Sequence, residues 1–128
     1  MAHEAAMRLA DLIECGLRAP NIVEKRSRYI VEGFKIDCCV IGMAFVATYI
    51  EQTGSTVGVG NKFWECIDMV ESSTRSQFDS LGEYIGVPKD LLYAVELEHL
   101  TKIVTASEIV VLLRVGEYDS VCETKEVV

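Results

Sequence analysis

His99 lies among acidic residues in a segment whose apolar spacing predicts a helix. Glu96 precedes it by three positions, so the two side chains share a helix face and could supply two metal ligands or an acid and base pair. No motif such as HExxH is present to complete such a site. The pattern therefore favours a helix-surface or interface histidine hydrogen-bonded to a carboxylate, and we predict no catalytic residue, no metal site and no cofactor.

The five cysteines do not have the spacing of a disulfide scaffold. They stand at positions 15, 38, 39, 66 and 122. Cys38 and Cys39 are adjacent, and on a helix they would point about 100° apart, which hinders binding of one metal ion. We interpret them as reduced thiols that pack as small apolar side chains, because the chain shows no export signal.

Four aromatic and polar side chains define an alternative interpretation, a pocket that binds a small molecule or a metal. They are Tyr49, Trp64, Tyr84 and His99. Trp64, the only tryptophan, has apolar neighbours at helical spacing, such as Phe63 and Ile67. That spacing favours a core or dimer-interface anchor over a ligand-stacking role.

Residues 77–96 have the spacing of a helix-turn-helix motif, with apolar or small residues where that motif needs them: Leu81, Gly82, Ile85, Gly86, Val87, Leu92 and Val95. The second helix would read the bases. It offers Lys89 against three carboxylates, Asp90, Glu96 and Glu98. Because base reading normally comes with cationic phosphate contacts, the charges argue against DNA binding.

The net charge of −8 is unevenly distributed. Residues 1–36 have six basic and five acidic side chains, so the remaining 92 residues carry −9. Such a surface repels phosphate backbones and argues against nucleic acid as a partner. Lys25, Arg26 and Arg28 form the one basic cluster, either a solvated loop or a surface that meets an anion or the acidic face of a second subunit.

A stretch without charge, residues 38–50, is the expected centre of the fold. A helix here would be apolar on most of its circumference and must be surrounded by other elements. We predict that Asp37 caps its first turn and that Gly54 ends it. The 128 residues suit one domain with a core of its own.

The other segments predict further helices around this centre. Pro88 can begin one helix, and Thr105 with Glu108 forms a capping box for the last. The expected fold is mainly all-α, a bundle of five or six helices, with a small β-hairpin near residues 28–36 or a continuation of helix there. Residues 1–116 form the domain, and 117–128 are expected to be an acidic tail, unless Tyr118, Val121 and Cys122 dock onto the body.

Three short patterns resemble small uncharacterised helical proteins of bacteria, phages and mobile integron gene cassettes. They are Cys-x-x-Gly-x-Ala at 39–44, Leu-Gly-x-x-x-Gly-Val-Pro at 81–88 and Thr-x-Ser-Glu-Ile at 105–109. Many of those proteins carry Leu-Asn-Asp before the last helix, where this chain has Leu97-Glu98-His99 or Leu100-Thr101-Lys102. The resemblance implies a helical, self-associating protein.

Together these patterns predict a non-enzymatic protein-interaction module that acts as a homodimer and also meets a protein partner. The longest uncharged run is shorter than the roughly 20 residues that a membrane helix needs. The first 18 residues lack the unbroken apolar centre of a signal peptide. A cytoplasmic location is the resulting expectation.

Overall fold

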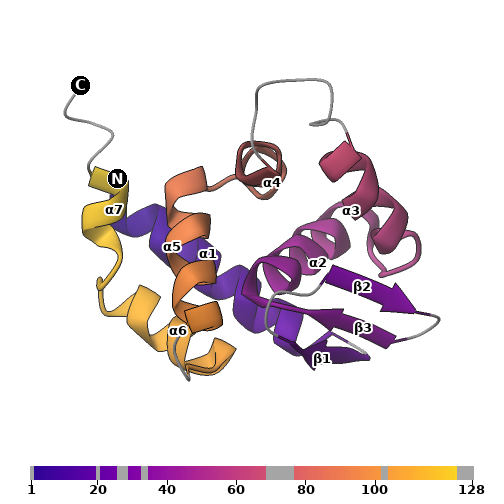
Figure 1. Cartoon of the computed structure of the whole chain (residues 1–128), viewed down its shortest axis with the longest axis horizontal. Coiled ribbons are helices and arrows are strands. Elements are labelled where there is room, and N and C mark those ends of the chain that lie inside the picture. The colour runs from indigo at the N-terminus through magenta and orange to yellow at the C-terminus, as the bar shows by residue number, and fades with distance from the viewer. Residues whose placement is uncertain are drawn as a thin grey trace.

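The computed structural model describes residues 2–19, 21–25, 29–32, 35–68, 77–101 and 104–123, and these form a mainly helical fold with a small sheet (Figure 1). The elements are α1 (Ala2–Leu17), β1 (Ile22–Glu24), β2 (Tyr29–Glu32), β3 (Lys35–Cys38), α2 (Val40–Thr53), α3 (Val59–Asp68), α4 (Gln77–Ile85), α5 (Lys89–Thr101), α6 (Ala106–Arg114) and α7 (Asp119–Glu123). The predicted fold class is confirmed. None of the described helices is long and apolar enough to cross a membrane.

Helix α2 is the predicted centre of the fold. Every residue from Val40 to Thr48 is buried, because the helix has no polar face to turn toward water. It ends where predicted, at Gly54, whose φ of 84° gives the left-handed cap that glycine adopts without strain. The amide of Gly54 donates to the carbonyl of Ile50 at 2.8 Å.

Helix α1 crosses α2 at close range. A Cβ built on Gly16 would lie 2.2 Å from the carbonyl oxygen of Met43, so only glycine permits this approach of the two backbones. Gly16 lies inside α1, one residue before its end at Leu17.

The strands form a three-stranded sheet in the order β1-β3-β2 at one end of the molecule, beside α2 (Figure 1). β2 and β3 are antiparallel, which agrees with the predicted hairpin, and β1 adds a parallel strand that the pattern did not indicate. The prediction of Asp37 as the cap of α2 is wrong. Asp37 pairs with Val23 and Ile30 inside the sheet, and Cys39 occupies the cap position, where its side chain makes no capping hydrogen bond to the first turn of α2.

The last long helix, α6, begins with the predicted capping box. The hydroxyl of Thr105 accepts from the amide of Glu108 at 3.2 Å, and the Glu108 carboxylate accepts from the amide of Thr105 at 3.4 Å. Two amides that the helix leaves without partners are thereby satisfied. The cap fixes where α6 begins, next to α5 and β1.

The first part of the predicted tail is ordered as helix. Residues 119–123 form α7, which packs against α1 and α5, and the side chain of Tyr118 before it is buried. Asp119 lies in the first turn of α7, where a carboxylate suits the helix dipole, and it bonds the imidazole of His3 at 3.0 Å. Docking of this segment on the body was the alternative that the sequence analysis left open. Residues 124–128 lie outside the described residues.

Candidate functional site

Helices α4 and α5 form a pair joined by a turn of three residues. The turn depends on two glycines. Gly86 has a φ of 87°, and the amides of Gly86 and Val87 both donate to the carbonyl of Gly82, at 2.8 and 3.1 Å. A Cβ on Gly82 would lie 2.9 Å from the carbonyl oxygen of Val87. The small residues of the helix-turn-helix pattern are therefore explained by close packing of the pair.

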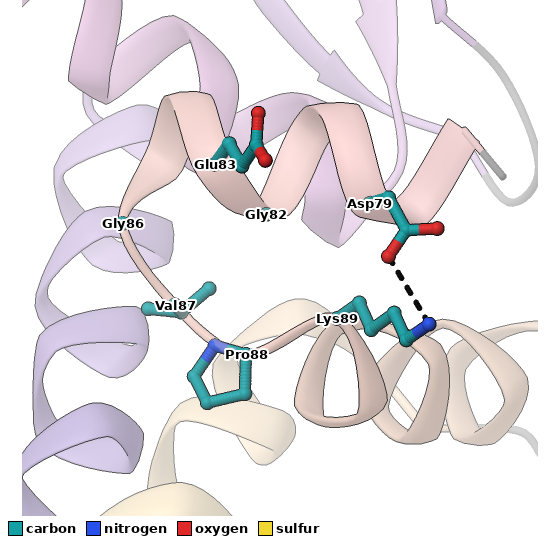
Figure 2. A pocket seen from close by; sticks show the side chains of 7 residues that line it. All are labelled: Asp79, Gly82, Glu83, Gly86, Val87, Pro88 and Lys89. Atoms are coloured by element: carbon teal, nitrogen blue, oxygen red, sulfur yellow. Dashed lines mark ion pairs between the residues drawn. The ribbon is translucent and has the colours of Figure 1, made fainter. Parts of the chain in front are cut away.

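The turn borders an open groove of about 320 Å³ between α4 and the start of α5 (Figure 2). Figure 2 shows Lys89 reaching across it to Asp79, with 3.1 Å between the ammonium nitrogen and a carboxylate oxygen. On the other side of the turn, Arg8 donates to the carbonyl of Ile85 at 3.1 Å. Arg8 therefore lies at the C-terminal end of α4, where the helix dipole is negative, whereas the Lys89 ammonium lies beside Asp79 in the first turn of that helix. The groove is lined by Asp79, Gly82, Glu83, Gly86, Val87, Pro88 and Lys89.

The outer face of α5, which we define as Tyr93, Leu97 and Leu100, is apolar and exposed. These side chains are 55%, 44% and 48% exposed. They are spaced four and three residues apart, so they form one stripe along the helix. Phe78 of α4 extends it, because its ring meets that of Tyr93 edge-on at 5.5 Å. Exposed apolar residues are common singly, but a row of this kind is a candidate contact surface.

The inner face of the same helix buries a histidine. His99 is fully buried, and its Nε2 lies 2.8 Å from Oε2 of Glu24 on β1. The same carboxylate oxygen accepts from the amide of Ala106 at 3.0 Å, at the start of α6. His99 therefore joins α5, the sheet and α6. It is hydrogen-bonded to a carboxylate as predicted, but the predicted place on the helix surface or at an interface is wrong, because the side chain is buried within the fold.

A second buried polar contact lies near the start of α2. The Cys39 thiol donates to Oε2 of Glu96 at 3.0 Å, and both residues are buried. Burial raises the pKa of the neighbouring Cys38 thiol from 9.0 to about 12, and the carboxylates of Asp37 and Glu24 add to the rise. A raised pKa keeps the thiol protonated, and the protonated form is a poor nucleophile. Burial likewise raises the pKa of Cys66.

The four residues of the predicted pocket have different surroundings. Tyr84 stacks on Phe45 with 4.6 Å between ring centroids, and its hydroxyl donates to Gln52 at 2.7 Å. The Tyr49 hydroxyl donates to the carbonyl of Val57. Trp64 meets the edge of Phe63 at 5.9 Å and is 53% exposed, whereas His99 contacts Glu24 as described above. Among the described residues, no three His, Cys, Asp or Glu side chains are placed to hold a metal ion.

Part of the predicted basic surface can be placed. Lys25 follows β1, is exposed, and its amide donates to the carbonyl of Cys38 at 2.9 Å. Arg26 and Arg28 lie outside the described residues. The prediction of an anion or subunit contact there stays a prediction.

The outer face of α5 was not predicted from the sequence. Leu91, Leu92, Val95 and His99 lie along the other side of this helix, and all four are buried. A helical projection would have shown Tyr93, Leu97 and Leu100 as a second stripe, on the side away from Leu92 and Val95.

Comparisons with protein-family models, with curated proteins and with solved structures found no match. The resemblance to integron cassette proteins therefore stays a prediction.

Proposed function

We propose that this chain is a non-enzymatic protein-interaction module that acts as a homodimer. The observation that carries the interaction part of the proposal is the outer face of α5, three large apolar side chains in a row that are each about half exposed. A row of this kind costs solubility unless a partner protein buries it, since burial stabilises by about 25 cal/mol per Å² of apolar surface.

The buried polar groups support the non-enzymatic part of the proposal. His99 and Cys39, which could act as a base and a nucleophile, are both fully buried and bonded to carboxylates within the fold. A catalytic group has to come within hydrogen-bond reach of a substrate. These two side chains hold elements together instead.

Trp64 is the side chain that we assign to the dimer contact. It is half exposed on α3, and tryptophan is among the residues that contribute most to binding at interfaces. Lys62 and Glu65, on either side of Trp64 in the sequence, form an ion pair at 3.5 Å, so their charges offset each other where a second copy would lie. Such pairing reduces the repulsion between two chains of −8.

Sedimentation velocity over a wide range of concentrations tests the dimer. We expect the wild-type chain to sediment as a dimer and Trp64→Ala to dissociate, with a loss of about 2 kcal/mol or more, roughly 30-fold in the dissociation constant. Val57→Ala, another exposed apolar side chain, is the matched control and should remain dimeric. Circular dichroism checks that the variants are folded. A monomeric wild type, or a Trp64→Ala variant that dimerises as tightly, would contradict the proposal.

A further inference from the structure

The α4 and α5 pair combines an apolar stripe with an excess of negative charge. Residues 77–101 carry five carboxylates and one lysine, a balance of −4, so a fifth of the chain holds half of the net charge of −8. Glu96 is buried on the inner side, and Asp79, Glu83, Asp90 and Glu98 remain at least partly accessible. The surface around the stripe is therefore acidic.

This charge selects among the molecules that could cover the stripe. A DNA duplex would bring phosphates toward the carboxylates, although the helix pair has the spacing of a DNA-binding motif. A second copy placed on the same face would bring its own four negative charges. A partner with basic side chains beside its apolar ones would instead be attracted both by the carboxylates and by the apolar stripe.

We propose that the outer face of α5, with the groove at the α4–α5 turn, binds a cationic amphipathic helix of a partner protein. The proposal rests on the function as an interaction module and names the kind of partner that this surface fits. Recognition of a helix through apolar anchors spaced three and four residues apart is a common mode of protein binding.

The dimensions suit this mode. α5 has 13 residues, so it is about 20 Å long, and the stripe from Tyr93 to Leu100 covers about two of its turns. A partner helix lying along the stripe would place its apolar side chains between Tyr93, Leu97 and Leu100. Its flanking lysines or arginines would face Asp90 and Glu98.

The groove would receive a basic side chain at the end of the stripe. Lys89 precedes Tyr93 by one helical turn, so the groove and the stripe adjoin. Within the chain, the C-terminal end of α4 already holds a guanidinium, because Arg8 donates to the Ile85 carbonyl at 3.1 Å. A partner's cation would meet the same negative helix end together with Glu83, whereas Asp79 lies in the first turn of α4 and is paired with Lys89.

Fluorescence anisotropy with labelled synthetic peptides tests the proposal on the full chain. The probe is a helical peptide of leucine and lysine with all leucines on one face. A scrambled peptide of the same composition is the first control, and a peptide with glutamate in place of lysine is the second. We expect only the amphipathic lysine peptide to bind tightly, and its affinity should fall with added salt, because salt screens exposed charges.

Three protein variants, of which Val111→Glu is the control, locate the contact. Leu97→Glu should weaken peptide binding at least tenfold, because it puts a carboxylate in the middle of the stripe. Val111→Glu changes an equally exposed apolar residue on α6 and should bind as the wild type does. Asp90→Lys should weaken binding of the lysine peptide and reduce its salt dependence.

Four outcomes of the peptide-binding experiments would overturn the inference. They are equal binding of the scrambled peptide, binding unaffected by Leu97→Glu, no binding at all, and duplex DNA that competes with the peptide. Self-association through this face would also overturn it, and would show as a dimer lost in Leu97→Glu but kept in Trp64→Ala. A Trp64→Ala variant that binds the peptide but remains dimeric would contradict the dimer contact and leave the peptide surface supported.

Discussion

Helices α2 and α5 differ in what they bury. α2 is apolar on almost all sides, and its residues 40–48 are enclosed by the rest of the fold. α5 buries His99 and Glu96 together with its leucines and exposes Tyr93, Leu97 and Leu100. Neither helix has an apolar side that is buried and a polar side that is exposed. α2 lacks a polar side, whereas α5 buries polar side chains on its inner face and exposes apolar ones on its outer face.

This difference shows that α2 serves only the core, whereas the two sides of α5 serve different purposes. α2 contributes by excluding water from the core, and any polar atom there would have to find a partner. α5 joins β1 and α6 through bonded polar groups on one side and leaves apolar area to water on the other. An arrangement that weakens the fold on its own is expected where a surface serves binding.

The largest effect is expected from a change in α2. Phe45 is buried and packs against the rings of Tyr84 and Phe63, at 4.6 and 5.1 Å. Phe45→Ala should lower the free energy of unfolding by about 3–5 kcal/mol, because it removes apolar contacts and leaves a cavity. Urea denaturation followed by circular dichroism measures this, with the exposed Val57→Ala as control. A loss below about 1 kcal/mol would mean that α2 is not the centre of the core.

A smaller loss is expected on the inner face of α5. His99→Ala removes the bond to Glu24 and leaves a cavity beside β1, so we expect a loss of about 2 kcal/mol in the same experiment. Leu100→Ala on the outer face of the same helix is the matched control and should change stability by less than about 0.5 kcal/mol. Equal losses from the two variants would remove the distinction between the faces.

The sequence predicted α2 better than α5, for a physical reason. An uncharged run can only be buried, so residues 38–50 indicated the core directly, and the αL residue Gly54 and the Thr105 capping box marked helix ends by local chemistry. Asp37 was misplaced because a strand pairing with distant residues, Val23 and Ile30, overrides a local capping preference. The partner of His99 was missed for the same reason, since Glu24 lies 75 positions away.

Alkaline pH should weaken the junction between the sheet and α2. Cys38 has a pKa of 9.0 in the unfolded chain and about 12 in the fold, so its contribution is complete below pH 9 and is lost as pH rises toward 12. From pH 9 to pH 10 the loss amounts to about 1 kcal/mol. Urea denaturation at the two pH values measures this. Between pH 9 and pH 10, the free energy of unfolding of Cys38→Ala should fall by about 1 kcal/mol less than that of the wild type.

Cys15→Ser, which removes a thiol that is exposed in the fold, is the matched control for the loss of a cysteine as such. The comparison stops at pH 10, since burial also raises the pKa of Tyr118 from 10.0 to about 12 and that hydroxyl contributes above this pH. If Cys38→Ala and the wild type lose stability in parallel, the thiol is not the titrating group.

The smallest effect on stability is expected where the effect on binding is greatest. Leu97→Ser exchanges a half-exposed apolar side chain for a polar one, so the free energy of unfolding should change by less than about 0.5 kcal/mol. Leu92→Ser, five positions earlier on the buried side, should cost about 3 kcal/mol or more, because it creates a cavity and buries a hydroxyl.

Binding of the amphipathic lysine peptide should fall at least tenfold in Leu97→Ser at unchanged stability. If Leu97→Ser instead unfolds the protein as readily as Leu92→Ser, Leu97 belongs to the core and the outer face of α5 is no binding surface. Stability and binding measured on this one pair of leucines therefore distinguish residues that build the fold from residues that the fold presents to a partner.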